Sequence, residues 1–381
     1  MTVLDSSLFE LLRGFSCLKP PNSLLFPQDF SLPAVHSFLL DNILLNPHFQ
    51  AYPPSAQYQK QFWKWAIAHL ERMPQPENEE DEVEIDPQIY EHYLELLPPS
   101  GPALGSSQPS TRSQICGRSL PMTQLPPSQS FLTHYWRPAG IPKQNEGSTV
   151  NLEEYRVATL LESRTTIESG TTGLRTWLAS FLLSQYLILH PEILNGKRVL
   201  ELGSGVGFLG IIAASLQNIS GSASSSSLWL TDVNDEVLAR CKYNLTLPCN
   251  MSEHPNIHYR NIDWSASVDQ EQYQSLASVL NDEIAPDVIL GADIVFDPSL
   301  ILALIGVLKL VLQPGSKQKS KYALIALTIR NESTIGRFLE EAQNQSVRFE
   351  EVPIDFDRTT FSETIESAHA QDNIKVFKFT L

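Results

Sequence analysis

The chain has 381 residues, of which 42% are hydrophobic and 18% charged, and its formal net charge at pH 7 is −16. This length suits two ordinary domains or one large domain with additions, and the composition excludes a chain that is disordered throughout. The acidic excess disfavours sequence-independent nucleic-acid binding, which depends on lysine and arginine, so no nucleic-acid partner is expected.

The spacing of the cysteines and the length of the apolar runs indicate the cellular compartment. Four cysteines without a CxxC spacing predict neither a zinc site nor a disulfide framework, so no bound metal is expected. The N-terminus lacks a basic segment followed by an apolar core, and no run of about 18 apolar residues occurs. We therefore expect a cytoplasmic monomer that does not associate with membranes.

Residues 1–97 are predicted to form an N-terminal helical domain. Apolar residues recur three and four positions apart in 4–15, 34–45 and 58–70. We interpret these stripes as the core of that domain, and a docking surface for a protein partner is the alternative. Residues 98–149 begin with a stretch rich in proline and serine and are predicted to be a linker.

From residue 150 to 381, a predicted helix at 153–161 precedes an alternation of strands and helices. The predicted strands are 198–202, 228–232, 257–262, 287–292, 322–328, 347–352 and 374–379, and the helices are 208–217, 235–245, 299–312 and 333–343. Near-continuous apolar strands that alternate with helices predict an α/β fold with a Rossmann-like, doubly wound, seven-stranded and mostly parallel sheet. The last two strands have no long helix between them, so one is expected to lie antiparallel at the sheet edge.

The segment VLELGSGVGFLG (199–210) is the most informative part of the chain. It places Gly203, Gly205 and Gly207 between a predicted strand and a predicted helix, where both dinucleotides and S-adenosylmethionine are bound in known proteins. A dinucleotide fingerprint has a third glycine where this chain has Phe208, and Glu201 provides a carboxylate that could face a cationic amino group. Both features favour S-adenosylmethionine; a dinucleotide site and a purely structural turn remain alternatives.

Acidic and aromatic residues follow the next two predicted strands. Asp232 ends the second strand, where a carboxylate can accept hydrogen bonds from both ribose hydroxyls of an adenosine. Asp263 and Trp264 follow the third strand, and they offer an acceptor for the adenine amino group and a flat apolar face for the purine. Together with the glycine turn, these residues predict an adenosine-containing cofactor.

With these motifs, the chain resembles the seven-β-strand, S-adenosylmethionine-dependent protein methyltransferases of class I. Within them it is most similar to the elongation factor 2 lysine methyltransferase family. The resemblance covers about residues 150–381 and rests on the glycine turn, Asp232, the Asp263–Trp264 pair, and the segments ESGTTGLRTW (168–177) and GADIVF (291–296).

The resemblance implies a cofactor and a set of contacts for it. The cofactor would be S-adenosyl-L-methionine, with Trp177 against its methionine end and the backbone of 203–205, including Ser204, around its amino-acid tail. Asp232 and the neighbouring Val233 would lie beside the ribose, Trp264 beside the adenine, and Ala292 along the pocket wall.

The resemblance also implies a reaction. The chain would be a protein-lysine N-methyltransferase, most similar to those that act on elongation factor 2, with Asp293 and Phe296 as the catalytic pair. The related lysine methyltransferases carry an aromatic residue, usually tyrosine, where this chain has Phe296, so the hydroxyl is absent and the carboxylate of Asp293 remains. A class I methyltransferase of another protein or of a small molecule, and a non-catalytic binding module that keeps the fold, are the alternatives.

Overall fold

The computed structural model describes residues 3–74, 84–97, 129–140, 148–314, 320–354, 360–361 and 373–381. These residues belong to two compact units: one contains the described residues within 3–132 and 148–150, and the other contains those within 133–140 and 151–381. Most of the predicted linker, 98–149, lies outside the described residues. None of the described helices is long and apolar enough to cross a lipid bilayer.

The first unit is built from short helices. They are α1 (Ser6–Ser16), α2 (Leu32–Phe38), α3 (Pro47–Ala51), α4 (Ala56–Leu70) and α5 (Pro87–Glu95), with a π-helix (Leu39–Leu44) after α2 and a small sheet of β1 (Val3–Asp5) and β3 (Thr149–Asn151). The ring of Phe15 lies 4.5 Å from that of Phe62 and 5.1 Å from that of Phe49, between centroids. All three rings are buried, and so are Val35 and Phe38 of the stripe at 34–45, which confirms that the apolar stripes form a core.

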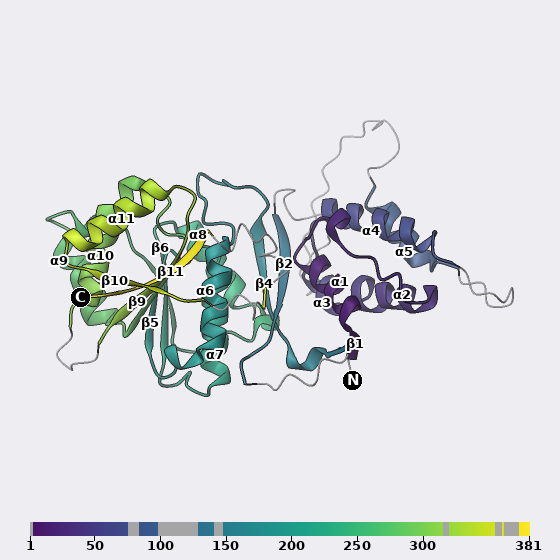
Figure 1. The fold of residues 1–381 in the computed structure, drawn as a ribbon, viewed down its shortest axis with the longest axis horizontal. Coiled ribbons are helices and arrows are strands. Elements are labelled where there is room, and N and C mark those ends of the chain that lie inside the picture. The colour runs from purple at the N-terminus through teal and green to yellow at the C-terminus, as the bar shows by residue number, and fades with distance from the viewer. Residues whose placement is uncertain are drawn as a thin grey trace, which may run out of the picture. The chain divides into compact units, whose positions relative to one another are not determined.

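The second unit contains the predicted seven-stranded sheet. Its strands are β5 (Arg198–Leu202), β6 (Ser227–Asp232), β7 (Ile257–Asn261), β8 (Val288–Ala292), β9 (Tyr322–Thr328), β10 (Arg348–Val352) and β11 (Ile374–Thr380). They lie in the order β10-β11-β9-β8-β5-β6-β7, and the five from β5 to β9 run parallel (Figure 1). The antiparallel strand is β11, but it lies between β9 and β10 rather than at the edge, because both of its sides are hydrogen-bonded.

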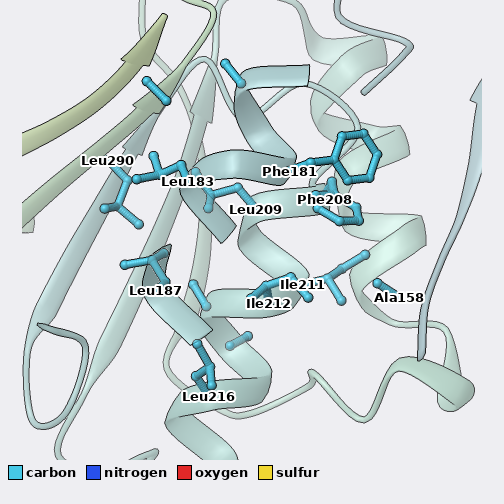
Figure 2. Packing of buried hydrophobic residues seen from close by; sticks show 14 of the residues in the cluster. Ala158, Phe181, Leu183, Leu187, Phe208, Leu209, Ile211, Ile212, Leu216 and Leu290 are labelled. Carbon is cyan, nitrogen blue, oxygen red and sulfur yellow. The ribbon is translucent and has the colours of Figure 1, made fainter. Parts of the chain in front are cut away.

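Helices cover both faces of this sheet. One face packs against α6 (Leu178–Leu189), α7 (Phe208–Ile219) and α8 (Asp235–Leu245), and the other against α9 (Tyr273–Ser278), α10 (Ile301–Leu312) and α11 (Glu332–Asn344). Side chains alternate along each strand, so Val199 and Leu290 pack in the first layer and Leu200 and Ile289 in the second. Figure 2 shows Leu290 beside Leu183 of α6 in the first layer.

A separate pair of strands, β2 (Gln129–Trp136) and β4 (Arg156–Ser163), corrects the helix predicted at 153–161. Only Leu152–Glu154 makes a single 3-10 turn before β4 begins. In β4, the N–H groups of Thr159 and Leu161 donate to the side-chain oxygens of Asn250 and Asn244, at 2.7 and 2.9 Å. These partners are distant in the sequence, and they satisfy the backbone of β4 as a strand.

Candidate cofactor and active site

A pocket of about 420 Å³ lies where the strands of the sheet end. Strand β5 has β6 on one side and β8 on the other, so the order of the strands reverses there, and such a switch point is where open α/β sheets bind ligands. Every predicted site residue except Glu201 and Gly207 lines this pocket: Trp177, Gly203, Ser204, Gly205, Asp232, Val233, Asp263, Trp264, Ala292, Asp293 and Phe296.

The glycine turn presents backbone to the pocket. Gly205 has a φ of +53°, and a Cβ there would lie 3.1 Å from the carbonyl oxygen of Gly173. Ser204 makes two hydrogen bonds with Thr231 of β6. Its N–H donates to Thr231 O at 2.8 Å, and its Oγ accepts from Thr231 N at 2.9 Å. Among the described residues, no side chain caps α7, so the first N–H groups of this helix can donate hydrogen bonds to a carboxylate or a similar anion.

Asp232 is fixed at the end of β6 by backbone donors. Its Oδ1 accepts from Asn234 N at 3.1 Å, and its Oδ2 accepts from Gly205 N at 3.3 Å. Burial raises the pKa of Asp232, while N–H groups of Asn234, Gly205 and Val233 lower it. The turn and this carboxylate are therefore tied together at one wall of the pocket.

Trp264 and Asp263 form the neighbouring wall. A Cβ on Gly203 would lie 3.7 Å from the Trp264 ring, so the indole packs against the glycine turn. Asp263 accepts a hydrogen bond from Ser265 N at 2.8 Å and caps the short helix Trp264–Ser267. A flat ring next to an acidic strand end fits an adenosine, and the volume of the pocket is within the usual range for small-molecule sites.

Trp177 belongs to a segment that β4 holds in place. Its Nε1 donates to Thr172 O at 3.1 Å, and Glu162 of β4 accepts hydrogen bonds from the N–H and the hydroxyl of Thr176. Burial raises the pKa of Glu162. The hydrogen bonds from Thr176 and the charges of nearby arginines lower this pKa, but by less than burial raises it. Residues 171–173 and 175–177 of this motif thus line the pocket, and the buried carboxylate of Glu162 holds Thr176 in place.

Asp293 is held by the end of β9. Its Oδ1 accepts from Thr328 N at 2.8 Å, and its Oδ2 accepts from Thr328 Oγ1 at 2.9 Å and from Arg330 Nη2 at 3.2 Å. Its backbone has a φ of +55°, which is uncommon for a residue with a side chain and typical of functional sites. The ring of Phe296 also lines the pocket but is 55% exposed, so it lies at the mouth.

Glu201 and Gly207 lie outside the pocket. Because Val199 faces α6–α8 and strand residues alternate, Glu201 faces the same layer, and its Oε2 would lie 3.2 Å from a Cβ on Gly210. Burial, followed by the charge of Asp232, raises the pKa of Glu201 well above its usual range. Gly207 allows close packing on α8, since its Cβ would lie 2.8 Å from the Sγ of Cys241. Glu201 therefore does not line the described pocket, and its contact with a cofactor amino group stays a prediction.

Comparison with known proteins relates the segment that forms this pocket to a protein family. Residues 160–345 match the family model described as lysine methyltransferase. The matched segment, just under half of the chain, is similar to the lysine methyltransferase family. It contains the glycine turn, Asp232, Trp264 and Asp293, and it extends from β4 to the end of α11.

Several relatives agree with this similarity. The chain is 30% identical over 205 residues to the protein-lysine N-methyltransferase EEF2KMT of Bos taurus, covering 51% of this chain and 58% of that protein. It is 34% identical over 187 residues to the protein-lysine N-methyltransferase EFM3 of Chaetomium thermophilum, covering 48% of this chain and 50% of that protein. The chain thus spans about half the length of these relatives, and they confirm the family resemblance drawn from the motifs.

An uncharacterised protein of Dictyostelium discoideum aligns with all of this chain and 95% of its own length at 25% identity. Among solved structures, fibrillarin of Methanococcus jannaschii is 16% identical with a TM-score of 0.36, and it covers 59% of this chain and 93% of that one. TrmN of Thermus thermophilus is also 16% identical, with a TM-score of 0.33, and covers 52% of this chain and 48% of that one.

Sequence reasoning missed three residues of the candidate site. Thr328 and Arg330 hold Asp293, and Glu162 holds the segment that carries Trp177. The one available signal was the position of Thr328 and Arg330 at the end of a predicted strand, because ligands bind at that edge of the sheet. Nothing marked Glu162, which lay just after a segment predicted to be helical.

Proposed function

We propose that this chain is an S-adenosylmethionine-dependent protein-lysine N-methyltransferase that acts on elongation factor 2. The observation that carries the proposal is the convergence of the glycine turn, Asp232, Trp264 and Asp293 on one pocket at the switch point of the sheet. Similarity to the lysine methyltransferase family supports lysine methylation, and the relatives named EEF2KMT support elongation factor 2 as the protein substrate.

The pocket has a place for each part of the cofactor. Asp232 would accept hydrogen bonds from the ribose, the Trp264 ring would cover the adenine, and the backbone of 203–205 would hold the amino-acid tail. When bound, S-adenosylmethionine supplies an activated methyl group, so an amine lone pair forms the new N–C bond while the C–S electron pair returns to sulfur.

The protein must then present a lysine without its charge. At pH 7, deprotonating a lysine with a reference pKa of ~10.4 costs about 4.6 kcal/mol. Trp177, Ile294 and Phe296 give the pocket apolar walls, and burial there disfavours the ammonium form. Asp293, which Thr328 fixes in one orientation, would accept a hydrogen bond from the amine and direct its lone pair toward the methyl group.

The test is transfer of label from S-adenosylmethionine to purified elongation factor 2, followed by mapping of the labelled residue. We expect label on lysine with the wild-type protein, and a loss of about ten- to a hundredfold with Asp293→Asn, as for a hydrogen bond to a charged group. Asp297→Asn is the matched control, because this exposed carboxylate caps the adjacent turn and does not line the pocket.

Each outcome separates the alternatives. Label found only on small molecules, or on another protein of a cell extract, would assign the chain to a different substrate. Absence of any transfer, with intact binding of S-adenosylmethionine, would favour a binding module that keeps the fold.

A further inference from the structure

Arg330 is a cation within the pocket that the proposed function has not used. It follows β9, and its guanidinium carbon lies 4.6 Å from the centroid of the Trp177 ring. Its Nη2 lies 3.2 Å from Oδ2 of Asp293, and the side chain is 49% exposed while that of Asp293 is 6% exposed. Arg330 therefore joins Asp293, the proposed acceptor for the substrate amine, to the pocket wall formed by Trp177.

The bonds of Asp293 leave limited room for a second cation. One oxygen accepts from Thr328 N, and the other accepts from Thr328 Oγ1 and from Arg330. A lysine ammonium that approached this carboxylate would share a single negative charge with Arg330. A neutral amine would need only one acceptor lone pair of Asp293, and it would meet no repulsion from the guanidinium.

The other charged groups around the pocket do not reverse this preference for a neutral amine over an ammonium group beside Asp293. Arg175 lies 5.8 Å from the centroid of the same Trp177 ring, so a second cation is near the amine position. Asp232 and Asp263 lie at the ends of β6 and β7, at the predicted ribose and adenine positions. Glu162 lies behind Thr176 and accepts its hydrogen bonds, and burial raises the pKa of this carboxyl group.

We propose that Arg330 is a positioning residue that keeps the target lysine unprotonated, because it offsets the charge of Asp293 and repels an ammonium group at the same place. This inference rests on the proposed function and deepens it. A like charge within a few ångströms shifts a pKa by about 1–3 units, and the exposure of Arg330 places the expected shift near the lower end. Arg330 would thus bring methyl transfer closer to neutral pH.

The experiment measures kcat on purified elongation factor 2 from about pH 6 to about pH 10, since kcat reports ionisations in the enzyme–substrate complex. With Arg330→Gln, the acid limb should move up by about one pH unit, so that kcat falls about tenfold near pH 7 and recovers near pH 10. Arg330→Lys keeps the positive charge, so the acid limb of its pH profile for kcat should lie at the wild-type position. Arg337→Gln, an exposed position on α11, is the control for loss of one positive charge.

Calorimetric titration with S-adenosylmethionine and thermal unfolding accompany the kinetics. All variants should bind S-adenosylmethionine within about twofold of wild type, a difference of under half a kcal/mol. An equal fall of kcat at every pH, or a matching loss of cofactor affinity in Arg330→Gln, would overturn the inference and assign Arg330 to the cofactor or to the fold. If the wild-type protein did not methylate elongation factor 2, the proposed function would fail first and this inference with it.

Discussion

Replacing Gly205 with alanine tests whether the glycine turn shapes the pocket. A left-handed backbone costs a residue with a Cβ about 1–2 kcal/mol, and the φ of Gly205 is +53°. The new Cβ would also lie 3.1 Å from the carbonyl oxygen of Gly173, a backbone atom of the segment that carries Trp177. Overpacking of this kind adds about 1–3 kcal/mol, so we expect a total loss of about 2–5 kcal/mol in the free energy of unfolding.

Gly221→Ala is the matched control for this substitution. Gly221 has a φ of +67° and no atom within 4 Å of an added Cβ, so its alanine variant should lose only the backbone term, about 1–2 kcal/mol. Urea unfolding measures both losses, and calorimetry should show cofactor affinity reduced on the order of tenfold in Gly205→Ala alone. Equal losses of stability in the two variants, with unchanged cofactor affinity in both, would refute the reasoning.

Three further predictions concern the walls of the pocket and the acid behind it. Asp232→Ala should weaken binding of S-adenosylmethionine by about 1.5–3 kcal/mol in calorimetry, and unchanged binding would show that the ribose assignment is wrong. Trp264→Ala should cost about 1–3 kcal/mol of cofactor affinity, as for a lost base-stacking partner, while Trp264→Phe should retain most of it; equal losses in both would count against stacking. Glu201 has a raised pKa in the folded state, so the native protein holds a proton that the unfolded chain releases, and stability falls as pH rises from the unfolded pKa through the folded one. Glu201→Gln should remove this component, which amounts to about 1.4 kcal/mol per pH unit, and a stability difference from wild type that does not change with pH in urea unfolding would contradict it.

The parallel part of the sheet could be predicted from sequence because each strand carries its own signal. Strands such as β5 and β8 are short, apolar and buried on both faces, and each is followed by a turn and a helical pattern. Strand β4 could not be found this way, because its residues also match a helical spacing. Its strand geometry depends on β2 and on the side chains of Asn244 and Asn250, which are distant in the sequence.

The residues of the candidate site also fall into those that a local sequence signal could place and those that depend on contacts distant in the sequence. Residues that end or directly follow a predicted strand, such as Gly203, Asp232 and Asp293, could be placed because parallel strands bring their carboxyl ends to one edge. The orientation of Glu201 depends on strand alternation, which directs it into the layer of α7 and α8. The ion pair of Arg330 with Asp293 joins positions 37 residues apart, and no local pattern indicates it.

Titration of the protein with S-adenosylmethionine and, separately, with NAD tests most directly which cofactor the pocket accepts. We predict saturable binding of the methyl donor at a single site, weakened by Asp232→Ala, and no binding of NAD at comparable concentrations. Tight binding of NAD, with no heat from the methyl donor, would contradict the assignment of the glycine turn and with it the proposed reaction.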